Sequence, residues 1–80
     1  MQIEHIGSNQ TVIYGNNFTV LFSYNTPVVL YDLKEGIYLR TDRNYSVTTS
    51  KHINKFLAKV PDSKIKRVPQ GSIEHLVNLM

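Results

Sequence analysis

The apolar residues of this chain change their spacing once, near residue 48. Upstream of that point, residues 18–24 alternate between two sets that face opposite sides of a strand, which is a period-two pattern. Downstream, apolar residues recur at helical spacing and form one stripe: Ile53, Phe56, Leu57 and Val60. Because the strands come first and the helices follow, the order predicts an α+β fold.

About five strands are expected between residues 2 and 47, and they should form an antiparallel sheet. Turn-forming residues separate the predicted strands, which span 2–6, 11–14, 18–24, 28–33 and 37–41. The almost continuous apolar run at 28–33 indicates a central strand that is covered on both faces. Alternation within 37–41 places Tyr38 and Arg40 outward. Residues 45–47 suit a last short strand, and residues 64–68 suit an edge strand.

Two short helices are predicted after the sheet, at about 50–59 and 71–79, and both are expected to pack on one of its faces. The first helix has its candidate N-caps at Thr48, Thr49 and Ser50, and Pro61 should end it by about residue 60. Ser72 is the candidate cap of the second helix. The apolar stripe of that second helix is Ile73, Leu76, Val77 and Met80.

Length and composition restrict the class of protein. Eighty residues form a single domain, 1–80, and a chain this short buries only about 60% of its unfolded surface, so a homodimer would add buried area. The absence of cysteine excludes disulfides, thiol catalysis and the usual structural zinc sites. Because there is no signal-like N-terminus and no apolar run of about 18 residues, we expect no membrane association and an intracellular location.

Charge is distributed unevenly along the chain. Residues 1–33 contain two acidic residues and no Lys or Arg, a balance of −2, whereas residues 34–80 contain nine basic and four acidic residues, a balance of +5. This asymmetry predicts an acidic partner for the C-terminal half. A basic face that is merely solvated explains the same distribution equally well.

Patterns typical of catalysis and metal binding are missing from the sequence. No two of the three histidines, His5, His52 and His75, share one helix at a spacing of four residues, as a zinc-binding pair would. Neither a nucleophile elbow nor a phosphate-binding loop occurs. We therefore expect a protein that is not an enzyme and that uses neither a metal nor a cofactor.

A row of lysines is the strongest sign of a binding surface. Lys51, Lys55 and Lys59 are spaced by four residues, so a helix at 50–59 would stack them opposite its apolar stripe. Like charges at this spacing destabilise a helix by about 0.2–0.5 kcal/mol per pair, and a cation in the first turn opposes the helix dipole. An anionic partner would offset both effects, although solubility alone also explains such a row. The candidate binding residues are Arg40, Arg43, Lys51, His52, Asn54, Lys55, Lys59, Lys64, Lys66 and Arg67.

Three segments occur together in this chain: Phe22-Ser23-Tyr24-Asn25-Thr26-Pro27-Val28, Tyr45-Ser46-Val47-Thr48-Thr49-Ser50-Lys51-His52-Ile53-Asn54-Lys55-Phe56-Leu57, and Val68-Pro69-Gln70. They resemble a family of small uncharacterised bacteriophage proteins, in which a Ser-Tyr-Asn-Thr-Pro turn precedes a Thr-Thr-x-x-His-Ile-Asn helix. The resemblance implies no activity, but it implies a phage protein that acts in the host cytoplasm. It draws attention to Asn25, Thr49, His52 and Asn54, for which a turn, a cap and helix–sheet bonding are the structural explanations.

Three functions are compatible with these observations. The leading hypothesis is a non-enzymatic binding protein that inhibits a host protein, such as a defence complex, through its basic C-terminal half. The alternative is direct binding of DNA or RNA by the helix at 50–59, and the third is a small virion or assembly component. The net charge of +3 and the excess of Lys over Arg favour a protein partner over nucleic acid.

Overall fold

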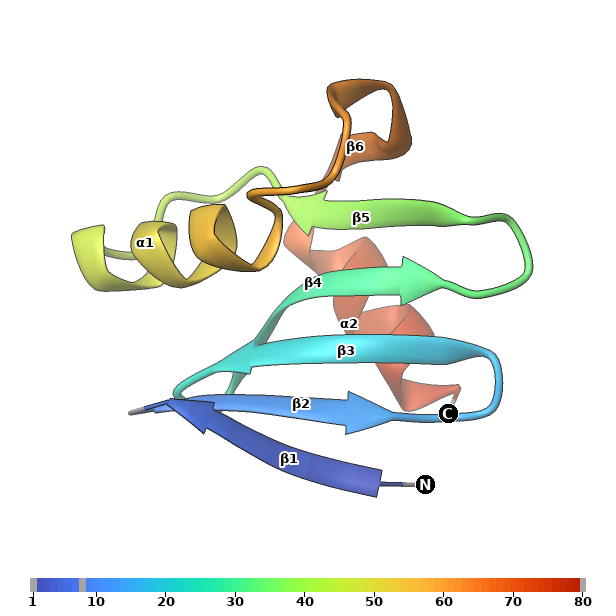
Figure 1. Ribbon diagram of the computed structural model, residues 1–80, viewed down its shortest axis with the longest axis horizontal. Helices are drawn as coiled ribbons and strands as arrows, with labels where there is room; N and C mark the ends of the chain where they lie inside the picture. The colour runs from blue at the N-terminus through green and yellow to red at the C-terminus, as the bar shows by residue number, and fades with distance from the viewer. Residues whose placement is uncertain (1, 8, 80) are drawn as a thin grey trace.

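Six strands and two helices make up the part of the chain that the computed structural model describes, residues 2–7 and 9–79 (Figure 1). The strands are β1 (Gln2–Gly7), β2 (Gln10–Tyr14), β3 (Phe18–Ser23), β4 (Thr26–Asp32), β5 (Ile37–Thr41) and β6 (Ile65–Val68). The helices are α1 (Val47–Phe56) and α2 (Gln70–Asn78), and a short 3-10 helix, η1 (Asp62–Lys64), precedes β6. Met80, the last residue of the predicted second stripe, lies outside the described residues.

The order of strands in the sheet follows the order of the chain, from β1 to β6. β1 to β5 form an antiparallel meander, which confirms the five predicted strands. β6 pairs with β5 in parallel, and α1 lies in the crossover that such a connection requires. The strand predicted at 45–47 is wrong, because these residues lead into α1, while the segment at 64–68 supplies the sixth strand.

The two helices cover opposite faces of the sheet (Figure 1). Leu21 of β3 packs with Val29 of β4 and with Ile53 of α1 in one core cluster. The next residue, Phe22, points to the other face and lines a hollow together with Val77 of α2. The expectation that both helices pack on one face is therefore wrong. Because the central strands are apolar on both sides, each face needs its own cover.

Burial confirms β4 as a strand covered on both faces. The side chains of Val28, Val29 and Leu30 are fully buried. The same double cover changes the environment of Tyr38, which was expected to point into solvent. Its ring stacks on Tyr31 with centroids 4.3 Å apart and meets the edge of the Phe56 ring at 6.5 Å. The outward face of 37–41 is thus the face that α1 covers, and its side chains are half-buried.

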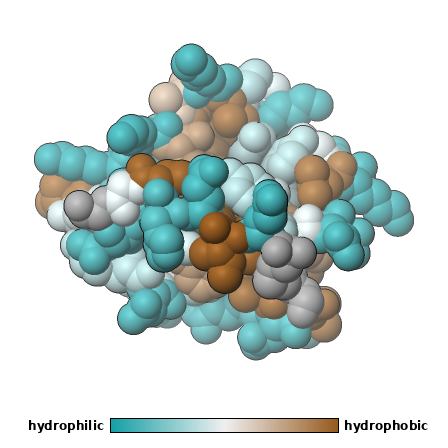
Figure 2. All heavy atoms as spheres, turned by 60° about the horizontal axis from the view of Figure 1, so that its bottom comes forward, coloured by the Kyte–Doolittle hydropathy of each residue, from teal (hydrophilic) through white to brown (hydrophobic). Residues whose placement is uncertain are grey.

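The surface seen from the β1 side is mixed. In Figure 2, the hydrophobic side chains of the described residues form separate groups among hydrophilic ones. Neither described helix combines the length and the hydropathy that a membrane crossing needs.

Candidate functional site

A chain of buried hydroxyl groups fixes α1 to β3. The hydroxyl oxygen of Ser23 lies 3.0 Å from Thr49 Oγ1 and 2.8 Å from His52 Nδ1, and all three residues are buried. Ser46 Oγ donates to Thr49 Oγ1 at 3.2 Å and extends the chain to the start of the helix. Buried polar groups are tolerated when they are hydrogen-bonded in this way. These contacts set which face of α1 meets the sheet and which face meets solvent.

The helix begins earlier than the sequence pattern predicts. Ser46 is the N-cap, because its Oγ accepts a hydrogen bond from the Thr49 N–H at 3.1 Å. The predicted caps, Thr48, Thr49 and Ser50, lie inside α1, and the predicted bounds of 50–59 are each displaced from the observed 47–56. The prediction for α2 is close, but Ser72 does not cap it: Pro69 occupies the N-cap position without a side-chain hydrogen bond.

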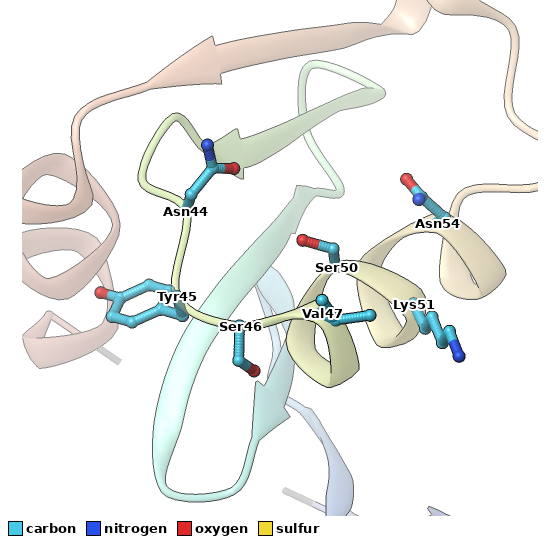
Figure 3. Close-up of a pocket in the computed structure, with 7 residues that line it drawn as sticks. All are labelled: Asn44, Tyr45, Ser46, Val47, Ser50, Lys51 and Asn54. Carbon is cyan, nitrogen blue, oxygen red and sulfur yellow. The ribbon is translucent and has the colours of Figure 1, made fainter.

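A surface hollow of about 470 Å³ lies at the start of α1 (Figure 3). We call it the α1 hollow, and its lining residues are Asn44, Tyr45, Ser46, Val47, Ser50, Lys51 and Asn54. Its lining is mostly apolar surface, to which Tyr45 and Val47 belong, with hydroxyl groups, amides and one ammonium group among it, and no acidic side chain is among the lining residues. Such a set of hydrogen-bond donors suits a negatively charged or carbonyl-bearing group of a partner.

The structure brings only part of the predicted lysine row to this hollow. Lys51 and Lys55 are both exposed on α1, but Lys59 follows the end of the helix and does not continue the row. Lys51 is the fifth residue of the helix, so the expected conflict with the dipole in the first turn does not apply. Lys55 lies in the last turn, where a cation is favourable. Asn54 is exposed beside these lysines and lines the α1 hollow.

Arg43 and Tyr45 add a second feature to the same region. The Arg43 guanidinium carbon lies 5.6 Å from the centre of the Tyr45 ring, and both side chains are exposed. A guanidinium at this distance is attracted to the face of the ring. Because Tyr45 lines the α1 hollow, its contact with Arg43 places this guanidinium group beside the hollow.

The other predicted basic residues lie elsewhere. Arg40 and Arg67 are paired across β5 and β6 and line a second hollow of about 370 Å³. Burial, and then the nearby charge of Arg67, lower the pKa of Arg40. Lys66 precedes Arg67 in β6, so its side chain is directed to the opposite face, and Lys64 is exposed in η1. The predicted basic residues therefore do not form one patch. Lys51 lines the α1 hollow, Arg40 and Arg67 line the second hollow, and the remaining cations line neither.

Thr49 and His52, which the resemblance singles out, both hold α1 to the sheet. Thr49 and His52 bind Ser23, so His52 faces the sheet rather than the partner side of α1. Asn25 is exposed and lines a hollow with the residues of the β3–β4 turn and α2. No group of three His, Cys, Asp or Glu residues that could hold a metal ion occurs among the described residues.

Asn44, Ser46 and Val47 were not predicted from the sequence as parts of a binding site. A Ser with hydroxyl residues following it was visible at 46–50, but four hydroxyl side chains compete there for the cap position. In the structure Ser46 caps the helix, and the Thr49 hydroxyl contacts Ser23 of β3. The hollow itself arises from the loop that joins β5 to α1, whose path depends on the position of α1.

The fold and the site define a small α+β protein with a cationic hollow at the start of one helix. The chain belongs to a family of unknown function (DUF8033), whose family model matches residues 1–75. Neither the curated proteins nor the solved structures give a match to this chain. Membership of an uncharacterised family is thus confirmed, and the bacteriophage origin stays a prediction.

Proposed function

We propose that this protein is a non-enzymatic binding protein whose α1 hollow docks onto an acidic surface of a partner protein. The observation that carries the proposal is the charge of this region. Lys51 lines the hollow together with the Asn54 amide, no acidic side chain lines it, and the chain has no acidic residue between Asp42 and Asp62. Cations without neighbouring carboxylates accelerate encounters with an acidic partner and select against basic ones.

The partner in this proposal is a protein of the host cell. The resemblance to small bacteriophage proteins supports a host target, and the specific form of the proposal is inhibition of a defence complex in the host cytoplasm by occupation of its acidic surface. The net charge of +3 supports a protein partner, because proteins that bind a phosphate backbone usually carry a more basic stripe.

A binding experiment with charge-matched variants tests the proposal. Tagged protein is incubated with nuclease-treated host lysate, and the retained proteins are identified and measured again as purified partners. We expect Lys51→Ala/Lys55→Ala to lose the partner, because both side chains are exposed on α1. The control Lys34→Ala/Lys66→Ala removes the same charge from the β4–β5 turn and from the face of β6 opposite to Arg67. This variant should still bind the partner. Equal loss in the two variants would refute docking at the α1 hollow.

Binding of single-stranded nucleic acid is the second candidate, favoured by the exposed Tyr45 ring beside Arg43. A base stacked on such a ring contributes about 1–3 kcal/mol. Anisotropy of a labelled oligonucleotide at two salt concentrations measures this interaction, and the affinity should fall steeply with salt. Retention of full affinity by Tyr45→Ala would exclude this mode, and absence of binding at low salt would exclude the candidate.

A further inference from the structure

We infer that Arg40 and Arg67 form a binding site for a phosphate group at the β5–β6 edge of the sheet. This site goes beyond the proposed function, because it uses a different hollow, different residues and a ligand of defined chemistry. It is assigned from the placement of the two guanidinium groups and from the missing partner of one of them.

The parallel pairing of β5 with β6 creates the site. Arg40 and Arg67 are directly opposite each other across these strands, so their side chains leave the sheet on the same face. Both line the hollow of about 370 Å³, together with Asp62 and Ile65. Like charges directly opposite each other destabilise a strand pair, and an anion between the two guanidinium groups would offset this repulsion.

Arg40 has an incomplete set of hydrogen bonds. Its Nε atom is buried and has no hydrogen-bond partner among the described residues. A buried donor without an acceptor is costly, and the cost is larger for a charged group. The single carboxylate in the lining, Asp62, leaves one positive charge when both arginines are counted. The lining of the hollow therefore carries one surplus positive charge, and one of its two arginines has a donor without an acceptor.

A phosphate group supplies what the hollow lacks. Its oxygens accept from two guanidinium groups at once, and arginine presents its N–H groups in a fork that matches this geometry. Ile65 forms an apolar wall, which limits the number of water molecules that compete with the bound oxyanion. The ligand is either free phosphate or the phosphate of a small molecule such as a nucleotide, which offer the same oxygens.

The test is a titration of the whole protein with inorganic phosphate, followed by the ¹⁵N–¹H signals of the arginine Nε–H groups. We expect the signals of Arg40 and Arg67 to shift together with one saturating curve, while the backbone amide signal of Lys34, which is exposed in the β4–β5 turn and lines neither hollow, stays unchanged. A parallel titration with adenosine monophosphate tells whether the site accepts a phosphate on a nucleotide. A control titration with sodium chloride at equal ionic strength should leave the Arg40 and Arg67 signals in place.

Variants separate phosphate recognition from charge alone. Arg40→Lys and Arg67→Lys keep the charge and lose the fork, and each should weaken phosphate binding by about tenfold, the loss expected for one charge-assisted hydrogen bond. Lys34→Ala, which removes a cation from the β4–β5 turn outside both hollows, is the control and should bind as the parent does. The parent titration does not depend on the folding of any variant. Unchanged Arg40 and Arg67 signals in the parent protein would overturn the inference, and so would binding that appears only in Asp62→Asn.

Discussion

Replacing Ser23 with alanine tests whether the buried hydroxyl chain holds α1 on the sheet. The Ser23 side chain is 1% exposed, and its oxygen lies 3.0 Å from Thr49 Oγ1 and 2.8 Å from His52 Nδ1. Each lost hydrogen bond contributes about 0.5–1.5 kcal/mol, and a buried group left without a partner adds about 1–3 kcal/mol. Thr49 keeps its contact with Ser46, whereas His52 Nδ1 loses the partner seen here. We therefore expect Ser23→Ala to lower the free energy of unfolding by roughly 2–4 kcal/mol.

The measurement is urea denaturation followed by far-ultraviolet circular dichroism. Thr49→Val keeps the shape of the side chain and leaves the Ser23–His52 bond intact, so it should cost less, about 1 kcal/mol. Ser63→Ala, at an exposed position of η1, is the control and should stay within about 0.5 kcal/mol of the parent. If Ser23→Ala fell within the range of that control, apolar contacts alone would hold α1, and the reasoning would be refuted.

Three further predictions concern the core, the backbone and pH. Ile53→Ala removes a side chain that is 2% exposed in the α1 core and should lower the free energy of unfolding by about 2–5 kcal/mol in the same urea assay. Gly36→Ala should destabilise by about 1 kcal/mol because φ is 68° there, whereas Gly71→Ala, inside α2 with open space around it, should stabilise by about 0.5–1 kcal/mol; equal signs in thermal melts would contradict this. Burial, and then the charge of Glu4, raise the pKa of Tyr14 in the folded protein. The protonated phenol therefore stabilises the folded state fully below the pKa that Tyr14 has in the unfolded chain, and this stabilisation is lost as pH rises through its folded pKa. Spectrophotometric titration of the phenols should show the Tyr14 midpoint falling in Glu4→Gln.

Much of the sheet was predictable because its signals are local. Alternating side chains and turn residues define β1 to β5 within a few positions of each strand, and the apolar run in β4 indicates cover on both faces. The bounds of α1 were less accessible, since four hydroxyl residues at 46–50 each have the chemistry of a cap. The strand predicted at 45–47 was wrong for a different reason: Tyr45 and Val47 have high strand propensity, but Val47 is the first residue of α1.

The candidate sites were only partly visible in the pattern of charge. The positions of Lys51, Lys55 and Asn54 on the exposed side of α1 follow from the helical stripe, because residues opposite an apolar stripe face solvent. The inward position of His52 could not be read in this way, because its partner Ser23 lies on a strand 29 residues earlier. Arg40 and Arg67 likewise become neighbours only through a parallel strand pair.

The sequence by itself determined the class of the fold, the approximate bounds of five antiparallel strands, the two apolar stripes and the basic character of the C-terminal half. Each of these four features depends on the period of side chains along a strand or helix, or on composition. None of them requires a contact between distant residues. The tertiary structure alone decided which face each helix covers, where α1 begins, and which cations share a hollow. Those features depend on contacts between residues far apart in the chain, such as Ser23 with His52 and Arg40 with Arg67. Local spacing carries no information about such contacts until the chain is packed.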